Sequence, residues 1–297
     1  MTHFRGNGLL ILALTCWLGI AAAWAGKTKG HLVIIGGGDR TEEIMKRFVD
    51  LAGGADKARI VIIPLASGDP VEAGTEAAAE FKGLGMKDVA WILFSRAEAA
   101  AESTAAKFDG ATGVYFTGGD QARVTRVIVG TPVQERLLRL YHDGAVIGGT
   151  SAGAAIMSKV MITGDELINK DTNNIFVSIQ KGNVQTVEGL GFLDQVIIDQ
   201  HFVKRKRLNR LISVVLEHPE LPGIGIDEST ALIVGPGGEC DVLGEGTIVV
   251  FDARGARSIQ SDKHGNLAAR NVVTHIYRSG EKMDLKSLLP PRSQKRR

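Results

Sequence analysis

The chain has 297 residues, of which 44% are hydrophobic and 23% charged, and its formal net charge at pH 7 is +2. This near-neutral balance gives no support for a nucleic-acid partner or for attraction to an anionic membrane surface. Once an N-terminal signal is set aside, the length suits one large α/β domain or two small ones, and the hydrophobic fraction is sufficient for a packed core.

The N-terminus has the three parts of a secretory signal peptide. Arg5 is followed by an uncharged apolar stretch, residues 9–23, and then by the small-x-small sequence Ala23-Trp24-Ala25. An uncleaved membrane anchor is the less favoured alternative, because the stretch is short for a span of roughly 20 residues. We therefore expect residues 1–25 to be removed, with secretion to the periplasm or the medium and no membrane attachment afterwards. Cys240 would then be the only cysteine, so no internal disulfide is expected.

Predicted strands and helices alternate between residues 31 and 150. Short apolar, β-branched runs predict strands at 31–35, 58–65, 89–94, 113–117 and 145–148. Helical periodicity predicts helices at 41–51 and 69–84 and two more that begin near residues 121 and 132. Continuous apolar strands separated by amphipathic helices are typical of a parallel sheet covered on both faces, with right-handed crossovers.

Beyond about residue 161 the pattern changes to short β-rich segments. Strands are predicted at 195–199, 223–226, 231–234, 247–251 and 272–277, with one helix at 208–216. We expect these segments to continue the same single catalytic domain, residues 26–289, with some antiparallel edge strands. Residues 290–297 are proline-rich and then basic, which is typical of a disordered tail.

The sequence Gly149-Thr150-Ser151-Ala152-Gly153 is a G-x-S-x-G motif between a predicted strand and a small-residue helix at 152–158. This strand–turn–helix context is the one that a serine nucleophile requires, because glycines permit the strained turn that exposes the serine. The N–H of Ala152 would point into the same space and could stabilise an oxyanion. The alternative interpretation is a small-residue turn that only allows close packing.

A second glycine turn follows the predicted strand at 113–117. Gly118-Gly119 could bring free backbone N–H groups against a ligand, and we expect the Gly119 N–H to assist Ala152. The alternative is an ordinary strand-to-helix turn in which Asp120 is the N-cap.

A serine nucleophile needs a base and a group that orients the base. The run 196–202 is apolar and then polar, so it would deliver Asp199, Gln200 and His201 to the catalytic edge of the sheet. His201 is therefore the favoured base. Asp227 and Glu228 follow another apolar strand, and either could be the acid, because strand periodicity points them to opposite faces.

A basic run directly follows the candidate base. Arg207 and Arg210 would share a helix face, and Arg205 could join them from before the helix. Guanidinium groups beside an acyl-transfer site indicate a substrate with carboxylates, which arginine binds bidentately. A solvated helix face is the simpler alternative, and nucleic acid is a weaker one.

Taken together, the motifs resemble those of the cyanophycinases, serine peptidases related to the aspartyl dipeptidases. The matching segments are Phe-Thr-Gly-Gly-Asp-Gln at 116–121, Gly-Thr-Ser-Ala-Gly-Ala at 149–154, Asp-Gln-His-Phe at 199–202 with the arginines after it, and Gly-Ile-Asp-Glu-Ser-Thr-Ala at 225–231. Their order and spacing agree over nearly the whole mature chain. The signal peptide makes the chain similar to the extracellular branch.

The resemblance implies a three-layer αβα sandwich with a mostly parallel sheet, similar to the class I glutamine amidotransferases, and a homodimer. It implies hydrolysis of cyanophycin, a poly-aspartate that carries arginine on each β-carboxyl, to β-Asp-Arg dipeptides. By motif, Ser151 is the nucleophile, His201 the base and Glu228 the acid. The implied substrate-binding residues are Gln121, Asp199, Gln200, Arg205, Arg207 and Arg210, with Asp199 suited to a guanidinium and the arginines to carboxylates.

We expect an acyl-enzyme mechanism that uses neither a metal nor a cofactor. The histidines lack zinc-ligand spacing, and Gly36-Gly37-Gly38 does not continue into a dinucleotide fingerprint. An aspartyl or isoaspartyl dipeptidase on the same scaffold is the nearest alternative, and a secreted binding protein without catalysis is another. An ordinary α/β-hydrolase esterase fits less well, because its acid would precede the histidine in the chain.

Overall fold

The structure, a computed structural model, describes residues 28–168 and 176–288. The predicted signal peptide at residues 1–25 and the predicted basic tail at 290–297 lie outside the described residues. Within the described ranges, no helix has both the length and the apolar character needed to cross a bilayer.

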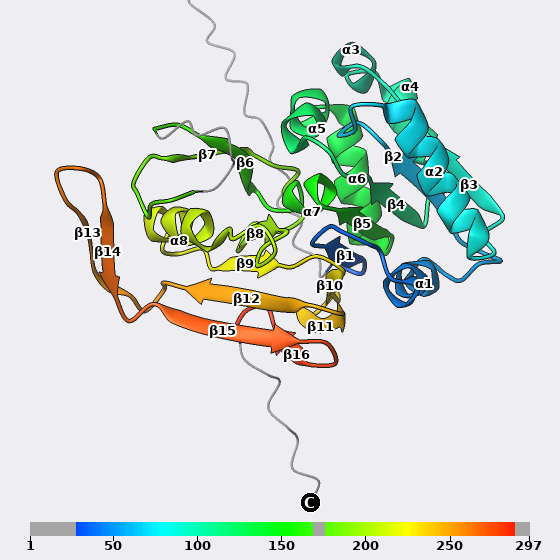
Figure 1. The fold of residues 1–297 in the computed structure, drawn as a ribbon. Coiled ribbons are helices and arrows are strands. Elements are labelled where there is room, and N and C mark those ends of the chain that lie inside the picture. Colours follow the sequence, from blue (N-terminus) through cyan, green and yellow to red (C-terminus); the bar gives the residue numbers. More distant parts are fainter. Residues whose placement is uncertain (1–27, 169–175, 289–297) are drawn as a thin grey trace, which may run out of the picture.

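The centre of the fold is an eight-stranded sheet with the strand order β16-β11-β10-β1-β5-β4-β2-β3 (Figure 1). The five strands from β1 to β3 in this order are parallel, and β10, β11 and β16 add to β1 as antiparallel strands. Their bounds are β1 His31–Ile35, β2 Arg59–Ile63, β3 Asp88–Trp91, β4 Gly113–Phe116, β5 Val146–Thr150, β10 Thr230–Val234, β11 Glu239–Gly244 and β16 Lys282–Asp284. The predicted parallel sheet with antiparallel edge strands is confirmed.

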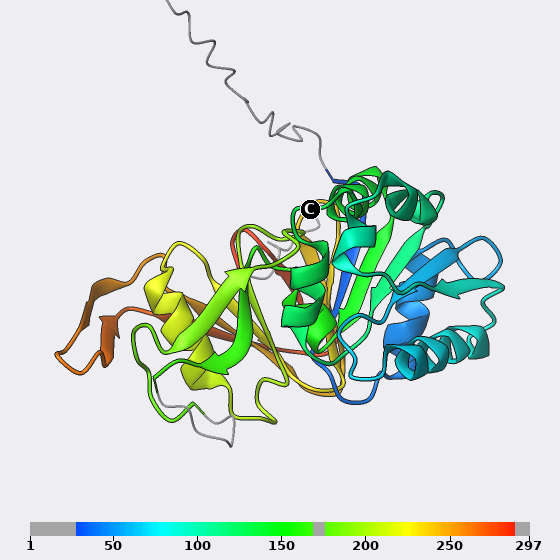
Figure 2. The same cartoon turned by 90° about the horizontal axis from the view of Figure 1, so that it is seen from above.

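Helices cover both faces of this sheet (Figure 2). Buried residues of α1 and α2 pack on one face, and those of α5, α6 and α7 pack on the other. The bounds are α1 Glu42–Leu51, α2 Pro70–Gly83, α3 Arg96–Ala99, α4 Glu102–Ala105, α5 Gln121–Ile128, α6 Pro132–Asp143 and α7 Ala152–Ala155, with a short 3-10 helix at Ala106–Phe108. The helix after Ser151 ends earlier than predicted, but the three-layer αβα fold is confirmed.

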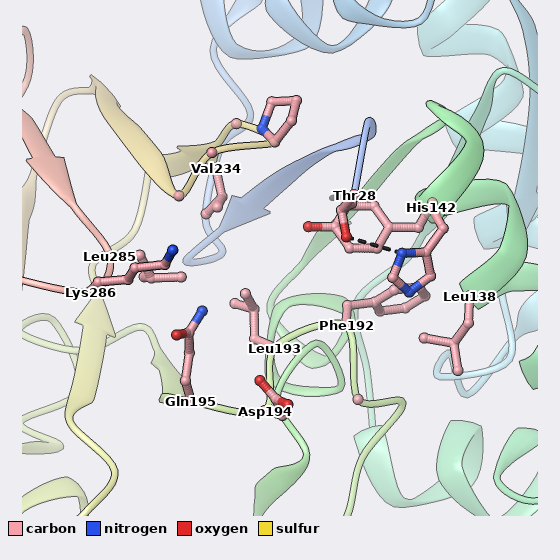
Figure 3. Close-up of a pocket in the computed structure, with 16 residues that line it drawn as sticks. Thr28, Leu138, His142, Phe192, Leu193, Asp194, Gln195, Val234, Leu285 and Lys286 are labelled. Atoms are coloured by element: carbon pink, nitrogen blue, oxygen red, sulfur yellow. Dashed lines mark hydrogen bonds between the residues drawn. The ribbon is translucent and has the colours of Figure 1, made fainter. Parts of the chain in front are cut away.

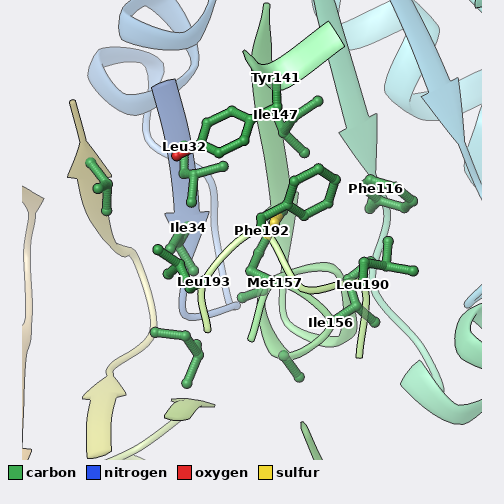
Figure 4. Packing of buried hydrophobic residues seen from close by; sticks show 14 of the residues in the cluster. Leu32, Ile34, Phe116, Tyr141, Ile147, Ile156, Met157, Leu190, Phe192 and Leu193 are labelled. Carbon is green, nitrogen blue, oxygen red and sulfur yellow. The ribbon is translucent and has the colours of Figure 1, made fainter. Parts of the chain in front are cut away.

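The parallel strands bury side chains on both faces, as their continuous apolar runs predict. Leu32 and Ile34 of β1 pack with Ile147 of β5 and with Ile156 after α7 (Figure 4). Val33 of β1 packs in the cluster on the α1 side of the sheet. All five of these side chains have no solvent exposure. Full burial of one Leu, Ile or Val side chain contributes roughly 1.5–3 kcal/mol, so the centre of the sheet is a rigid platform for loops at its edge.

The late strands also form a second sheet, which the sequence analysis did not predict. Its order is β15-β12-β9-β8, with β8 and β9 parallel. One face packs into the main core and the other face is covered by α8, because both faces of these strands carry apolar side chains. The bounds are β8 Ile197–Gln200, β9 Gly223–Ile226, β12 Thr247–Asp252, β15 Val273–Arg278 and α8 Leu208–Glu217.

Two antiparallel ribbons complete the described chain. One pairs β6, Val160–Glu166, with β7, Val184–Glu188, and its register shifts between Ile162 and Glu166. The other pairs β13, Arg257–Ser261, with β14, Leu267–Arg270, and lies beyond the second sheet in Figure 1. The β6–β7 ribbon lies beside β8, so it borders the carboxyl edge of the second sheet.

Candidate active site

Ser151 occupies a strained turn at the carboxyl end of β5. Its φ of 54° and ψ of −111° lie outside the regions that non-glycine residues ordinarily adopt. The flanking Gly149 and Gly153 have no room for a side chain, since a Cβ on either would overlap neighbouring backbone. The side chain is thereby exposed at the sheet edge, as in a nucleophile turn.

His201 and Glu228 follow the neighbouring ends of β8 and β9. The Ser151 hydroxyl lies 2.8 Å from Nε2 of His201, and Nδ1 of His201 lies 2.6 Å from Oε1 of Glu228. The sequence left Asp227 and Glu228 open as partners of the histidine. Asp227 instead accepts backbone N–H groups of Val203 and Lys204 through Oδ1. The structure therefore brings together a Ser-His-Glu chain of hydrogen bonds.

The electrostatic surroundings favour neutral His201 and ionised Glu228. Burial lowers the pKa of His201 from its ordinary value, and the positive charges of Arg205 and Arg207 lower it further, while the hydrogen bond to Glu228 partly opposes them. The hydrogen bond from His201 is the main cause that lowers the pKa of Glu228. A neutral imidazole that donates from Nδ1 to a carboxylate can accept a proton at Nε2, which is what a general base requires.

The end of β1 and the loop after it hold the three segments that carry Ser151, His201 and Glu228. Three consecutive carbonyl groups, those of residues 35–37, accept the N–H groups of Ser151, His201 and Ser229 at 3.0, 2.7 and 2.8 Å. The φ of Gly37 is +106°, and a Cβ there would overlap the His201 ring. Sequence reasoning considered this glycine run only as a nucleotide motif. Its position at the end of the first parallel strand was the signal for a role beside the catalytic edge.

The turn at Gly118-Gly119 lies against Ser151. A Cβ on Gly118 would lie 3.5 Å from Cβ and 3.9 Å from Oγ of Ser151. Gly119 has a φ of +135° and no room for a side chain, because a Cβ would overlap the Ala66 carbonyl. The Asp120 N–H donates to that carbonyl at 2.8 Å, which fixes the turn. Gly119 and Ala152 thus flank Ser151, where two N–H groups could meet one oxyanion.

A polar pocket of about 290 Å³ opens beside Ser151. Four arginines contribute to its wall, and the lining residues are Gly119, Asp120, Gln121, Ala122, Arg126, Ser151, Thr163, Gly164, Asp165, Gln200, Arg205, Arg207 and Arg210. Of the six predicted substrate-binding residues, five line this pocket. Such a concentration of positive charge next to a nucleophile suits a substrate with carboxylate groups.

Arg207 is half-buried, and not all of its N–H donors have an acceptor among the described residues. Its Nη1 donates to the backbone carbonyl and to Oε1 of Gln200, at 2.7 and 2.6 Å. Its buried Nε has no hydrogen-bond partner within the described part of the chain. Burial, followed by the charge of Arg210, lowers the pKa of Arg207 to about 10, so the side chain remains a cation at neutral pH. A buried donor without a partner is a position where a ligand atom is expected.

Asp199 does not line the pocket. Its side chain is 1% exposed, and both of its oxygens accept hydrogen bonds from Arg210, one of them at 2.8 Å. Arg210 also lies over the ring of Phe176, with 5.7 Å between the guanidinium carbon and the ring centroid. Asp199 therefore neutralises and positions Arg210, and its carboxylate is not open to a substrate guanidinium.

Gln121 and Arg205 lie on two sides of the pocket. The Gln121 amide donates to the carbonyls of Ile162 and Thr163, at 2.9 and 2.6 Å, which ties the start of α5 to β6. Arg205 is more exposed, and its Nε lies 3.6 Å from Oε1 of Glu228. Arg205 can thus contact both a ligand and the acid of the hydrogen-bond chain.

Sequence reasoning missed the part of the wall that β6 supplies. Asp165 and Gly164 lie where the β6–β7 register shifts, and Gly164 has a φ of +104°. Such irregularities redirect side chains next to active sites, and this one places Asp165 on the pocket. Only the weak strand pattern after residue 160 could have indicated this segment, and it carries no recognisable motif.

Another pocket, of about 310 Å³, lies at the opposite end of the central sheet (Figure 3). It is lined by Thr28, His142 and Val234, among others, and Val234 pairs with Leu32 at the start of β1. Ser151 instead follows Thr150, which pairs with Ile35 at the end of β1. None of the three residues of the Ser-His-Glu chain lines this pocket, so we assign the chemistry to the carboxyl edge.

Comparisons with known proteins identify the family to which the chain belongs. The model of peptidase family S51 matches residues 32–239. A cyanophycinase of Geminocystis herdmanii is 33% identical over 88% of this chain and 96% of its own, and one of Trichormus variabilis is 34% identical over 89% of each chain. A peptidase crystal structure from an acI-B1 Actinobacterium has a TM-score of 0.62 at 20% identity, covering 87% of this chain and 98% of its own, and supports the fold.

Proposed function

Because the chain belongs to peptidase family S51 and is a serine-type peptidase, we propose that it is an exported cyanophycinase. In this proposal it hydrolyses multi-arginyl-poly-aspartate to β-Asp-Arg dipeptides. The observation that carries the proposal is the Ser151–His201–Glu228 chain of hydrogen bonds beside an arginine-lined pocket. The cyanophycinases at 33–34% identity support the substrate, and the sequence at residues 1–25 supports export.

The proposed chemistry proceeds through an acyl-enzyme. His201 removes the Ser151 proton through Nε2, and Oγ attacks the backbone carbonyl of an aspartyl residue. The N–H groups of Gly119 and Ala152 stabilise the oxyanion, and His201 then donates the proton to the departing amine. Water, deprotonated by the same imidazole, breaks the ester and releases Ser151. Glu228 remains ionised throughout and holds His201 in the required tautomer.

Recognition of the aspartyl-arginine unit requires groups for both of its charges. Arg205 and Arg207 line the pocket beside Ser151 and suit the carboxylate of the unit. The carboxylates of Asp120 and Asp165 line the same pocket. Asp120 already has partners, because it is the N-cap of α5 and lies 3.7 Å from Arg126. Asp165 has no ion pair among the described residues. We therefore assign the substrate guanidinium to Asp165, with Asp199 acting indirectly through Arg210.

The resemblance also leads us to propose a homodimer. Size-exclusion chromatography with light scattering, on protein that begins at Gly26, would measure the mass directly. A monomer at micromolar concentration would contradict this part of the proposal and leave the catalytic assignment intact.

The proposed function is tested by product analysis. Purified mature protein is incubated with insoluble cyanophycin and, separately, with aspartyl and isoaspartyl dipeptides, and the products are identified by mass spectrometry. Release of β-Asp-Arg, lost in Ser151→Ala, is the expected result. Cleavage of the dipeptides without attack on the polymer would retain the Ser151 chemistry and assign the chain to the aspartyl dipeptidases. No cleavage, together with no labelling of Ser151 by a fluorophosphonate, would indicate a binding protein.

A further inference from the structure

A smaller pocket lies on the other side of the Gly118-Gly119 turn from the arginine-lined pocket. It has a volume of about 120 Å³ and is lined by Arg40, Ala73, Glu76, Ala77, Tyr115, Thr117, Gly118 and Thr150. Gly118 lines this pocket, whereas Gly119 lines the larger one. The two pockets therefore share the turn that touches Ser151, and neither contains the other's charged residues.

Three buried hydroxyl groups without partners line the small pocket. Tyr115, Thr117 and Thr150 are 1%, 7% and 5% exposed, and their side-chain oxygens make no hydrogen bond within the described part of the chain. Burial raises the pKa of Tyr115, which keeps its hydroxyl protonated. Buried hydroxyls in native proteins nearly always have partners, so three in one small pocket indicate a polar ligand.

Two carboxylates, those of Glu76 and Glu80, lie near the single guanidinium of Arg40 at the small pocket. Arg40 forms a bidentate ion pair with Glu80, with distances of 3.0 and 2.7 Å to one carboxylate oxygen, so these two charges cancel. Glu76 lies on the exposed face of α2 at the pocket, and it forms no ion pair among the described residues. A cation therefore suits the pocket better than a carboxylate does.

A planar guanidinium matches these features. It has five N–H donors and no acceptor, so it can donate to three hydroxyl oxygens and to a carboxylate at the same time. The volume equals that of about four water molecules, which accommodates the head of an arginine side chain and not a whole aspartyl-arginine unit. The rest of such a unit would remain at the mouth, next to Ser151.

We propose that this pocket binds the guanidinium of the aspartyl-arginine unit on the leaving side of the scissile bond. The inference rests on the proposed function, and it assigns the unit on the acyl side to the arginine-lined pocket. A peptide bond positioned at Ser151 extends in two directions, and the two pockets lie on the two sides of the glycine turn. Each then offers one unpaired carboxylate, Asp165 or Glu76, to one arginine of the polymer.

The test uses two synthetic substrates that each contain two aspartyl-arginine units. In the second substrate, neutral citrulline, which has nearly the same shape, replaces the arginine of the leaving unit. We expect the wild-type enzyme to cleave the first with a kcat/KM about tenfold higher, as for a hydrogen bond to a charged group. Glu76→Gln should reduce this preference, because it should lower kcat/KM for the arginine substrate more than for the citrulline substrate. Glu72→Gln, one turn earlier on α2 and outside the pocket, should keep the wild-type preference.

The outcomes separate this inference from the proposed function. Equal cleavage of both substrates by the wild type would overturn the assignment of the pocket and leave the peptidase assignment standing. A Glu76→Gln variant that lowers kcat/KM equally for both substrates would also overturn it, because that result indicates a structural role. Failure of the wild type to cleave either substrate would instead overturn the proposed function.

Discussion

At the residue scale, three of the seven described non-glycine residues with a positive φ lie at the site. Ser151, His201 and Ser229 have φ values of 54°, 49° and 52°, and such conformations cost about 1–3 kcal/mol for each non-glycine residue. The three consecutive carbonyls of residues 35–37, at the end of β1, accept hydrogen bonds from the N–H groups of all three residues. The geometry of the site is therefore determined by the backbone before any substrate binds.

Replacement of Glu228 by glutamine should lower kcat on the order of 10³–10⁴-fold, because the amide can neither stabilise an imidazolium nor fix the tautomer of His201. Asp227→Asn is the matched control, since Asp227 contacts backbone N–H groups of Val203 and Lys204 and not the histidine. Steady-state kinetics on β-Asp-Arg-containing peptides, with circular dichroism as a check on folding, would measure both. A larger loss in Asp227→Asn than in Glu228→Gln would contradict our choice of acid.

The pH dependence of kcat/KM should reflect the lowered pKa of His201. Activity requires the neutral imidazole, so kcat/KM should rise with pH, and its midpoint should fall below about 6.5, the ordinary histidine value. The charge of Arg205 is one of the causes that lower this pKa, so Arg205→Gln should move the midpoint to higher pH, whatever its effect on binding. A midpoint that moves to lower pH in this variant would contradict the electrostatic assignment.

Asp165→Asn should weaken the binding of β-Asp-Arg about tenfold or more, because a charged hydrogen bond is lost. Calorimetry in a Ser151→Ala background measures binding without turnover. The citrulline analogue of the dipeptide, which lacks the positive charge, should bind equally well to both proteins. Asp194→Asn, which changes an exposed carboxylate of the opposite pocket, is the matched control. Equal weakening of both ligands would show that Asp165 is structural and does not contact the guanidinium.

At the element scale, the loop after β1 connects the two sheets at the site. Its carbonyls accept N–H groups from the segments after β5, β8 and β9, which belong to different sheets. Gly37 is the tightest point, because its missing side chain makes room for the His201 ring. A loop that supplies none of the three side chains of the hydrogen-bond chain thus determines the position of His201.

Gly37→Ala should lower kcat by more than about 10²-fold, because the added methyl group displaces the base and small misplacements have effects of this size. Gly54→Ala is the matched control: Gly54 also has a positive φ, of +82°, but a Cβ there would meet nothing within 4 Å. Both variants should lose about 1–2 kcal/mol of unfolding free energy from backbone strain. Thermal denaturation and kinetics together separate the shared strain from the catalytic loss, and an active Gly37→Ala enzyme would contradict the role of the loop.

Elements with strong local patterns were predictable, and those defined by long-range pairing were not. The strands from β1 to β5 and the helices α1 and α2 follow from apolar runs and helical periodicity, and the site motifs lie at the ends of such strands. The second sheet could not be predicted, because β8, β9 and β12 have the same apolar pattern as strands of the first sheet. At the site, residue type identified Asp199 but could not reveal that Arg210 occupies it, nor that a register shift places Asp165 on the pocket.

At the whole-molecule scale, stability comes from the packing of two sheets, and no disulfide joins any part of the described chain. Its single cysteine, Cys240, is buried in β11 near the edge of the main sheet, and burial raises the pKa of its thiol to about 12. We expect a native protein that reacts very slowly with thiol reagents and has a melting temperature unaffected by reductant. Rapid labelling of the native mature protein would show that the edge formed by β11 and β16 opens without global unfolding.

The division of the proposed triad between two sheets has a consequence for how activity would be acquired. Ser151 belongs to the first half of the chain, while His201 and Glu228 follow strands of the second sheet. A chain in which only the parallel core has formed would therefore carry Ser151 without its proposed base. In the proposed mechanism, hydrolysis therefore requires the second sheet to be docked against the parallel core, because only then does Ser151 have its base.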